Sequence, residues 1–301
     1  YTHGRISEVL QLDFEAVPVD ARGKMDISAL ERHLDGGEVG GTVVATLGTT
    51  GIGAVDPLAE ILELRKRHGF RVHVDAAYGG YFTLADNLGD DARRAFDCLD
   101  QADSIVVDPH KHGLQPYGCG CVLFRDPAVG GIYKHDSPYT YFSSDELHLG
   151  EISLECSRAG AAAVALWATQ RLLPMEKGGT FAGDLAKCRQ AALRLHQRLL
   201  DDPHYLTLFP PELDIVTWAP KAASSGEISA LSRNLFHEAA QLDLHLALFE
   251  LPVEITKPYW PDVEPDRTHV TCLRSCLIKP EHLEWIDAIW DILARLAPRS
   301  A

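Results

Sequence analysis

Two short apolar runs, each leading to a charged side chain, constrain the fold of this chain most strongly. Val72–Val74 is followed by Asp75, and Ile105–Val107 leads into the segment DPHK, which ends at Lys111. A β-branched apolar run that stops at a polar residue is typical of a buried parallel strand, which presents that residue in the crevice at its carboxyl end. We therefore predict two neighbouring strands that bring Asp75 and Lys111 to the same edge of one sheet.

An acid and a lysine at one sheet edge match the two poles of pyridoxal 5'-phosphate (PLP). The lysine amine condenses with the aldehyde carbon of this cofactor, and the carboxylate keeps the pyridine nitrogen protonated so that the ring accepts electrons. Asp75 and Lys111 are therefore the first candidates for a cofactor site.

The flanking segments predict alternating strands and helices. Thr42–Leu47 is expected to be a buried strand, and Asp56-Pro57 to cap and open a helix that ends at Gly69. Strand, helix and strand in this order imply a mostly parallel sheet covered by helices. We also predict strands at 14–19, 119–124, 215–218 and 271–277, and helices at 25–34, 159–173, 181–200, 228–242 and 281–296.

Three motifs, in order, resemble those of the pyridoxal-dependent group II amino acid decarboxylases. They are TLGTTGIGAVDPL at 46–58, HVDAAYGGY at 73–81 and DPHKHG at 108–113. The continuation GLQPYGCG at 113–120 is most similar to the bacterial tyrosine and aromatic L-amino acid decarboxylases of this family. The resemblance extends over about residues 1–174 and fades afterwards.

The resemblance implies the fold of the PLP-dependent transferases, the aspartate aminotransferase-like fold type I. This α/β fold has a mostly parallel central sheet covered by helices, followed by a small α+β C-terminal domain. We expect residues 1–175 to be the C-terminal part of the large PLP-binding domain and residues 176–301 to be the small domain. The N-terminal part of the large domain is expected upstream of Tyr1.

The resemblance assigns the two poles of the cofactor. It makes Lys111 the Schiff-base lysine, Asp75 the partner of the pyridine nitrogen, and Ala77 a residue packed on the ring. The alternative for Lys111 is a solvated charge, and an Asp after a strand is also a common turn cap.

The resemblance places four further residues around the cofactor. Thr50 is expected to contact the active site and His73 to lie close to the cofactor. His110 is expected to help hold the phosphate, with Asp108 beside it, although a carboxylate next to a phosphate repels it unless it is bridged. Ordinary turn chemistry for Thr50, and a core histidine bonded to the backbone for His73, are the alternatives. The main phosphate cradle and the histidine that stacks on the ring are expected upstream of the chain.

The return of a proton to the α-carbon is assigned, by resemblance, to a tyrosine of a long loop. Tyr139 and Tyr141 fall in this loop, and His148 is a further candidate near the substrate. Tyr117 matches a tyrosine of the tyrosine decarboxylases and is also expected near the substrate. Aromatic loop residues can instead be interface contacts.

The function implied is an L-amino acid decarboxylase that releases CO2 and a primary amine, with an aromatic amino acid such as tyrosine favoured. Relatives imply a homodimer with shared active sites. A transaminase, an aldehyde-forming oxidative deaminase or a silent PLP-binding scaffold would keep the same acid and lysine. A zinc-binding module is the alternative of another class, with His110, His112, Cys119 and Cys121 as ligands, although we expect no metal.

Composition excludes other classes of function. A formal net charge of -15 argues against affinity for nucleic acid or an anionic membrane. The longest run of small or apolar residues, 159–168, is too short to span a bilayer. Seven scattered cysteines do not form a disulfide framework in a chain of 301 residues, so a cytoplasmic location is expected.

Overall fold

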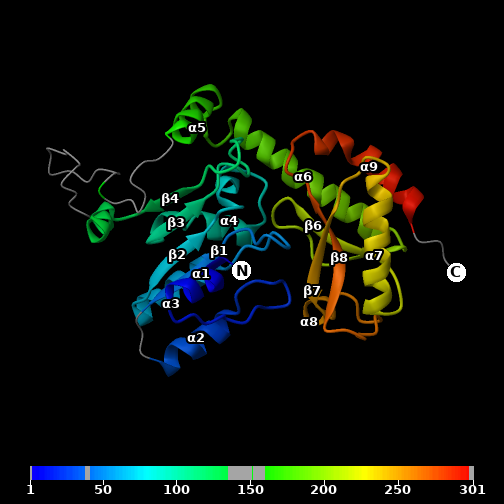
Figure 1. Cartoon of the computed structure of the whole chain (residues 1–301), viewed down its shortest axis with the longest axis horizontal. Helices are drawn as coiled ribbons and strands as arrows, with labels where there is room; N and C mark the ends of the chain where they lie inside the picture. The colour runs from blue at the N-terminus through cyan, green and yellow to red at the C-terminus, as the bar shows by residue number, and fades with distance from the viewer. Residues whose placement is uncertain (1, 38–40, 135–150, 152–159, 298–301) are drawn as a thin grey trace.

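The computed structural model describes residues 2–37, 41–134, 151 and 160–297. Figure 1 shows a first sheet flanked by helices and, beside it, a second sheet formed by the C-terminal part of the chain. The α/β class and the mostly parallel first sheet are confirmed.

The first sheet has the strand order β1-β2-β3-β4. Strands β1, β2 and β3 are parallel, and β4 is antiparallel to β3. The strands are β1 (Thr42–Thr46), β2 (Arg71–Asp75), β3 (Ser104–Val107) and β4 (Cys121–Phe124). In β2, Val72 and Val74 are fully buried while His73 and Asp75 are half-buried, because alternate side chains of a strand point to opposite faces.

Helices and helical turns surround this sheet (Figure 1). They are α1 (Thr2–Leu10), α2 (Ile27–Gly36), α3 (Leu58–His68) and α4 (Asp90–Phe96), with 3-10 turns at Gly80–Leu84, Leu99–Gln101 and Pro127–Tyr133. Helix α3 ends, as expected, at Gly69 in the left-handed conformation. Asp56 does not cap this helix. Its carboxylate instead accepts hydrogen bonds from the main-chain N–H groups of Met25 and Thr46, at 2.8 and 2.7 Å.

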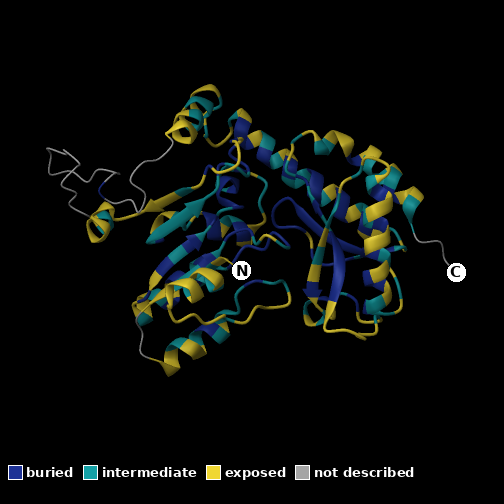
Figure 2. Cartoon of the chain, viewed as in Figure 1, coloured by how far each residue is buried: buried dark blue, intermediate teal, exposed yellow. Residues whose placement is uncertain are grey.

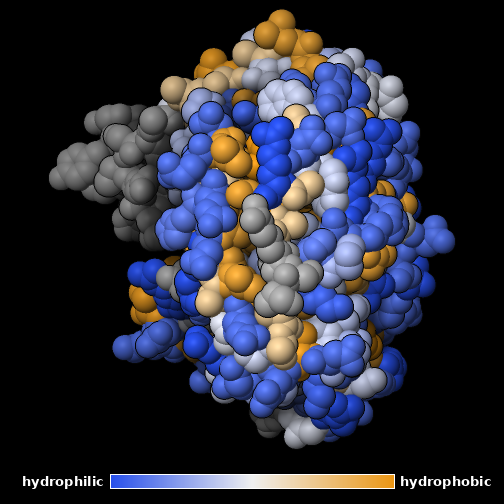
Figure 3. Space-filling view, turned by 90° about the vertical axis from the view of Figure 1, so that its right-hand side faces the viewer, coloured by the Kyte–Doolittle hydropathy of each residue, from blue (hydrophilic) through white to orange (hydrophobic). Residues whose placement is uncertain are grey.

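The second sheet has the order β5-β6-β8-β7, and all its pairings are antiparallel. The C-terminal elements are α5 (Ala161–Leu172), α6 (Thr180–Asp201), β5 (Tyr205–Thr207), β6 (Ile215–Pro220), α7 (Ser225–Ala240), β7 (Ala247–Pro252), α8 (Val253–Thr256), β8 (His269–Cys276) and α9 (His282–Leu296). Strands β6 and β8 are almost completely buried, whereas α7 and α9 keep an exposed side (Figure 2). The molecular face on this side is mostly hydrophilic (Figure 3).

One expected strand is missing from the structure, and two observed strands were not expected. The strand expected at 14–19 is wrong, because only an isolated bridge between Val19 and Met25 forms there. Strands β5 and β7 were not predicted: β5 has three residues, and β7 contains Glu250 and ends in Pro252.

None of the helices in the described part of the chain combines the length and apolar composition needed to cross a membrane.

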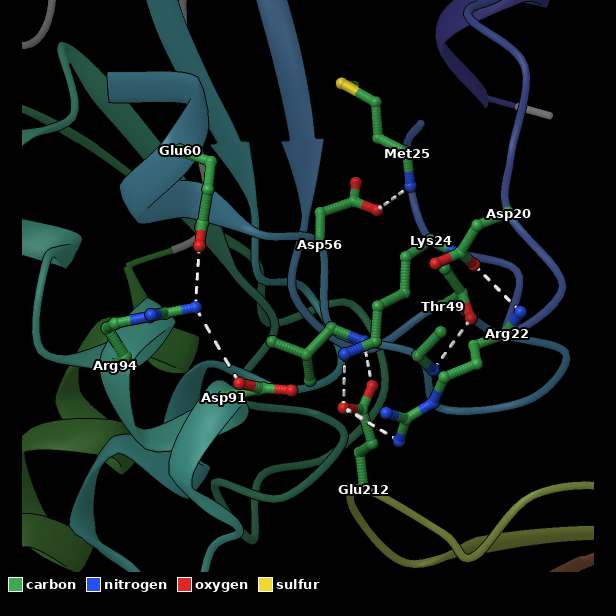
Figure 4. Close-up of polar contacts among 12 residues, drawn as sticks. Asp20, Arg22, Lys24, Met25, Thr49, Asp56, Glu60, Asp91, Arg94 and Glu212 are labelled. Carbon is green, nitrogen blue, oxygen red and sulfur yellow. Dashed lines mark hydrogen bonds and ion pairs between the residues drawn. The ribbon is translucent and has the colours of Figure 1, made fainter. Parts of the chain in front are cut away.

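The segment between β5 and β6 joins the two sheets. Leu213 and Ile215 belong to the same apolar cluster as Val72 and Val74 of β2. In this segment the carboxylate of Glu212 lies 2.5 Å from Lys24 Nζ and accepts the Val55 N–H at 2.9 Å (Figure 4). The apolar core thus extends across the expected division between residues 175 and 176, and that division remains a prediction.

Glu212→Gln is expected to destabilise the fold by about 3 kcal/mol, because it leaves the buried Lys24 ammonium without its counter-charge. Glu60→Gln is the matched control, since Glu60 forms an exposed ion pair with Arg94 at 2.6 Å and is expected to cost about 0.5 kcal/mol or less (Figure 4). Urea unfolding of both variants measures the difference. Equal losses would contradict a buried ionic link between the two sheets.

Candidate active site

Three loops meet at the carboxyl edge of the first sheet. The loop after β1 contacts the loop after β2, where the Gly79 N–H donates to the Leu47 carbonyl at 3.1 Å. A Cβ on Gly79 would lie 2.2 Å from that oxygen, so only glycine allows this approach. The loop after β3 joins them, because the Asp108 N–H donates to the Ala77 carbonyl at 3.2 Å.

Asp75 is the last residue of β2, and its carboxylate faces this edge. Oδ2 lies 2.9 Å from His3 Nε2, and Oδ1 accepts the Ala77 N–H at 3.1 Å. Burial raises the pKa of Asp75, but the hydrogen bonds from His3 and Ala77 and the positive charges of His3 and Lys111 outweigh burial and lower it. Asp75 is therefore held as a carboxylate by the groups around it.

The lowered pKa of Asp75 predicts a pH dependence of stability. A folded-state pKa below the unfolded value means that the carboxylate stabilises the fold above about pH 4, and that this contribution is lost as the pH falls through the folded-state pKa. Asp75→Asn is expected to show a smaller fall in Tm than the wild type between about pH 5 and pH 3. Thermal unfolding across this range tests the sign, and parallel curves for the two proteins would contradict it.

Lys111 lies in the turn that follows β3. Its Nζ is 3.0 Å from Asp108 Oδ2, and its side chain is 31% exposed, so the amine is accessible. Strands β2 and β3 are parallel neighbours with Asp75 opposite Val106, so Lys111 follows β3 at the same edge, and its positive charge contributes to the lowered pKa of Asp75. The structure thus brings Asp75 and Lys111 into one site, as the two strand ends predict.

His110 and Tyr117 lie beside Lys111. His110 Nδ1 donates to the Cys119 carbonyl at 2.6 Å, and its Nε2 lies 3.6 Å from Asp108 Oδ2. The Tyr117 ring is 5.0 Å from the His110 ring and is 95% exposed. Asp108 therefore lies between His110 and Lys111, and its Oδ2 atom is close to the side chains of both.

His73 lies in the middle of β2, and Thr50 lies in the turn that follows β1. His73 Nδ1 lies 2.8 Å from Ser104 Oγ, a side-chain partner, and its ring is 5.8 Å from that of His3. Burial, with the charge of His3, lowers the pKa of His73, which favours a neutral imidazole. Thr50 is exposed on the turn after β1, and Ala77 is half-buried after Asp75.

Three of the predicted site residues, Tyr139, Tyr141 and His148, lie outside the described residues. His3, by contrast, was not predicted as a site residue although it bonds the Asp75 carboxylate. Its partner lies 72 residues away in the sequence, and a single histidine in the first turn of α1 gives no local signal of such a contact.

Arg274 of β8 was also not predicted. Its Nε is buried and has no hydrogen-bond partner among the described residues. Burial and the charge of Asp214 raise the pKa of the Tyr78 hydroxyl, and the positive charge of Arg274 opposes this shift.

The residues of the zinc alternative are engaged elsewhere. His112 donates from Nδ1 to the Tyr78 carbonyl at 3.0 Å, and its Nε2 lies 2.8 Å from Asp214 Oδ2. His110 bonds the main chain at Cys119. Within the described residues, no three His, Cys, Asp or Glu side chains are grouped as ligands of a metal ion.

Comparison with known proteins decides the family. The model of the pyridoxal-dependent decarboxylase conserved domain matches residues 2–218. The chain belongs to the pyridoxal-dependent decarboxylase family. The family implies PLP as the cofactor, and an accessible lysine amine with an ionised carboxylate at the same sheet edge is the donor set that PLP requires.

Individual relatives differ in the substrates that their names state. The chain is 29% identical over 280 residues to an L-tyrosine decarboxylase of Enterococcus faecium, covering 76% of this chain and 45% of that protein. It is 37% identical over 172 residues to an L-2,4-diaminobutyrate decarboxylase of Acinetobacter baumannii, covering 54% of this chain and 33% of that protein. The chain thus spans less than half the length of these two relatives.

Solved structures support the fold. A structure described as Oryza sativa TDC with PLP and tryptamine superposes with a TM-score of 0.79 at 20% identity, over 99% of this chain and 61% of that one. The expected fold type I is confirmed, and the C-terminal sheet, whose strand directions were not predicted, is antiparallel.

Proposed function

We propose that this member of the pyridoxal-dependent decarboxylase family is an L-amino acid decarboxylase that releases CO2 and a primary amine. The observation that supports it most is the meeting of Asp75 and Lys111 at one sheet edge, with the charge of Lys111 acting on the Asp75 carboxyl. Where an acid and an amine share an edge in this way, they can serve opposite ends of one PLP ring.

Each proposed contact has a separate task. Lys111 would hold the cofactor through its aldehyde carbon, and Asp75, fixed by the Ala77 N–H, would keep the pyridine nitrogen protonated. His110 helps hold the phosphate, with Asp108 positioned between it and Lys111. Thr50, His73 and Ala77 complete the proposed cofactor contacts.

When bound, PLP supplies a ring that takes up the electron pair left behind as CO2 departs. The residues of this chain then have to exclude water and return one proton to the α-carbon. We assign that proton transfer to Tyr139 or Tyr141, with His148 and Tyr117 near the substrate.

An aromatic amino acid such as tyrosine is the proposed substrate, on the similarity of the GLQPYGCG segment to tyrosine decarboxylases. The Acinetobacter relative supports a second candidate, 2,4-diaminobutyrate. Incubating PLP-loaded protein with tyrosine, tryptophan, aspartate and 2,4-diaminobutyrate separates the two. We expect CO2 and amine in equal amounts from tyrosine.

The same incubation distinguishes the other reactions of PLP enzymes. Ammonia and aldehyde in place of amine, formed with CO2 and with consumption of O2, would indicate decarboxylation coupled to oxidative deamination instead of simple decarboxylation. Amino transfer to a keto acid would indicate a transaminase. PLP binding without turnover of any amino acid would indicate a silent scaffold.

A homodimer with shared active sites, located in the cytoplasm, completes the proposal. The proposed dimer is supported by exposed apolar side chains on β4, on the 3-10 turn at Pro127–Tyr133 and on α5. They are Val122, Leu123, Phe124, Ile132, Val164 and Trp167. Light scattering on the purified protein is expected to give twice the monomer mass, and a monomer would contradict the shared sites.

A further inference from the structure

A buried group of three residues lies directly behind Lys111. Tyr78 follows β2, His112 follows Lys111, and Asp214 precedes β6 in the C-terminal part of the chain. The His112 and Asp214 side chains are 1% and 0% exposed, and Tyr78 is buried as well. We call these three residues the buried triad.

The three residues of the buried triad are joined to one another by hydrogen bonds. The Tyr78 hydroxyl donates to Asp214 Oδ1 at 2.7 Å, and Asp214 Oδ2 lies 2.8 Å from His112 Nε2. A carbonyl oxygen only accepts, so His112 Nδ1 carries a hydrogen and donates it to Tyr78 O at 3.0 Å. Both carboxyl oxygens of Asp214 are thus paired with side chains from the loops that follow β2 and β3, and breaking either contact leaves a buried oxygen unpaired.

The buried triad connects the second sheet to the turn that carries Lys111. The main chain of Asp214 is fixed to the second sheet, because its carbonyl accepts the Leu277 N–H at 2.9 Å just beyond β8. Its side chain reaches 102 residues back to His112, the residue next to Lys111. Burial and hydrogen bonding together give this contact one geometry.

The turn around Lys111 responds to this contact because it is tightly built. A Cβ on Gly113 would lie 2.4 Å from the Tyr81 hydroxyl, and Leu114 adopts a positive φ of 59°. The main-chain N–H groups of Lys111 and Gln115 donate to Asp108 O and Pro109 O, at 2.9 and 3.1 Å. Because the turn has no free space, a displacement of His112 also displaces the main chain of Lys111.

We propose that Asp214 is a positioning residue, which acts through His112 to fix the Lys111 turn relative to the second sheet. This proposal rests on the proposed function where it concerns PLP, but the coupling itself is a property of the chain alone. Lys111 is the residue that touches the cofactor. Asp214, His112 and Tyr78 set where its amine lies.

Hydrogen exchange of the full-length protein, followed by mass spectrometry of peptides from 109–118, tests the coupling without PLP. Tyr78→Phe removes one donor to Asp214 at constant shape, and Asp214→Asn removes the charge at constant size. Both are expected to speed amide exchange in 109–118 by about tenfold. His112→Leu removes the contact with Asp214 and is also expected to speed amide exchange in 109–118. His112→Gln keeps a donor for Asp214 and is expected to retain most of the wild-type protection from exchange.

Tyr205→Phe is the matched control. It also removes a buried tyrosine hydroxyl, which donates to Leu293 O at 2.7 Å within the C-terminal part. We expect a similar fall in Tm but unchanged exchange in 109–118. If Tyr78→Phe affects this peptide no more than Tyr205→Phe does, the buried triad serves packing only and the proposal is wrong. This comparison holds even if Asp214→Asn does not fold.

Release of bound PLP is the second readout. In PLP-loaded protein, Tyr78→Phe is expected to raise the release rate by about tenfold and Tyr205→Phe to leave it unchanged. Wild-type protein that takes up no PLP at Lys111 would contradict the proposed function, and the exchange data would then decide the coupling alone. Wild-type uptake with equal release rates in both variants would instead contradict the positioning role.

Discussion

Lys111→Ala is expected to lower kcat for CO2 release by at least about 10³-fold, because no amine remains at the sheet edge to bond the cofactor and exchange it with the substrate. Lys111 is accessible and lies beside the ionised Asp75, so its loss removes one pole of the site while leaving the β-sheet unchanged. Release of CO2 from tyrosine at saturating PLP measures the effect.

Lys187→Ala is the matched control for this variant. Lys187 forms the same kind of ion pair three residues apart, with its Nζ 2.9 Å from Asp184 Oδ1, but it lies on α6. It is expected to keep wild-type turnover. Full activity in Lys111→Ala would remove the proposed mechanism altogether.

Asp75→Asn is expected to lower kcat by about 10²-fold or more, because a neutral amide does not hold the pyridine nitrogen protonated and the ring becomes a weaker electron acceptor. The amide still fits the space, and its oxygen still accepts the Ala77 N–H. Folding and PLP uptake should therefore survive, so the loss appears in turnover rather than in binding.

Asp103→Asn is the matched control, which distinguishes the loss of a carboxylate at the site from the loss of a carboxylate elsewhere in the sheet. Asp103 immediately precedes β3, at the opposite end of the strand from the site, and accepts the Val72 N–H at 2.8 Å. Burial raises its pKa, but this hydrogen bond and the charges of Arg65 and Arg125 lower it. This variant is expected to lose stability and keep kcat. Equal losses of turnover in the two variants would show that Asp75 acts through stability alone.

The sequence alone located the strand ends and the residues on them because these depend on local patterns. A β-branched run that stops at Asp75 or before Asp108 can be recognised from a few consecutive residues. Parallel strands then bring their carboxyl ends to one edge of the sheet. The resemblance to a known family then supplied the task of each side chain. The edges of α3, β2 and β3 were predicted within one or two residues.

Contacts between distant segments could not be predicted in this way. His3 meets Asp75 across 72 residues, and His112 meets Asp214 across 102, with no periodicity to signal either pairing. The local sequence presents His112 as a possible zinc ligand, because His110, Cys119 and Cys121 lie within ten residues of it. The sequence predicts Asp56 as the cap of α3. In the structure its carboxylate instead accepts hydrogen bonds from the N–H groups of Met25 and of Thr46 in β1, and these tertiary hydrogen bonds replace the local capping bond.

Borohydride reduction of the PLP-loaded protein, followed by peptide mass spectrometry, tests most directly whether Lys111 and Asp75 serve one PLP. We predict that the pyridoxyl group is found on Lys111, that Lys111→Ala carries none at the site, and that Asp75→Asn is still labelled on Lys111 although its turnover is low. A pyridoxyl group on another lysine of the active wild-type protein would contradict the account.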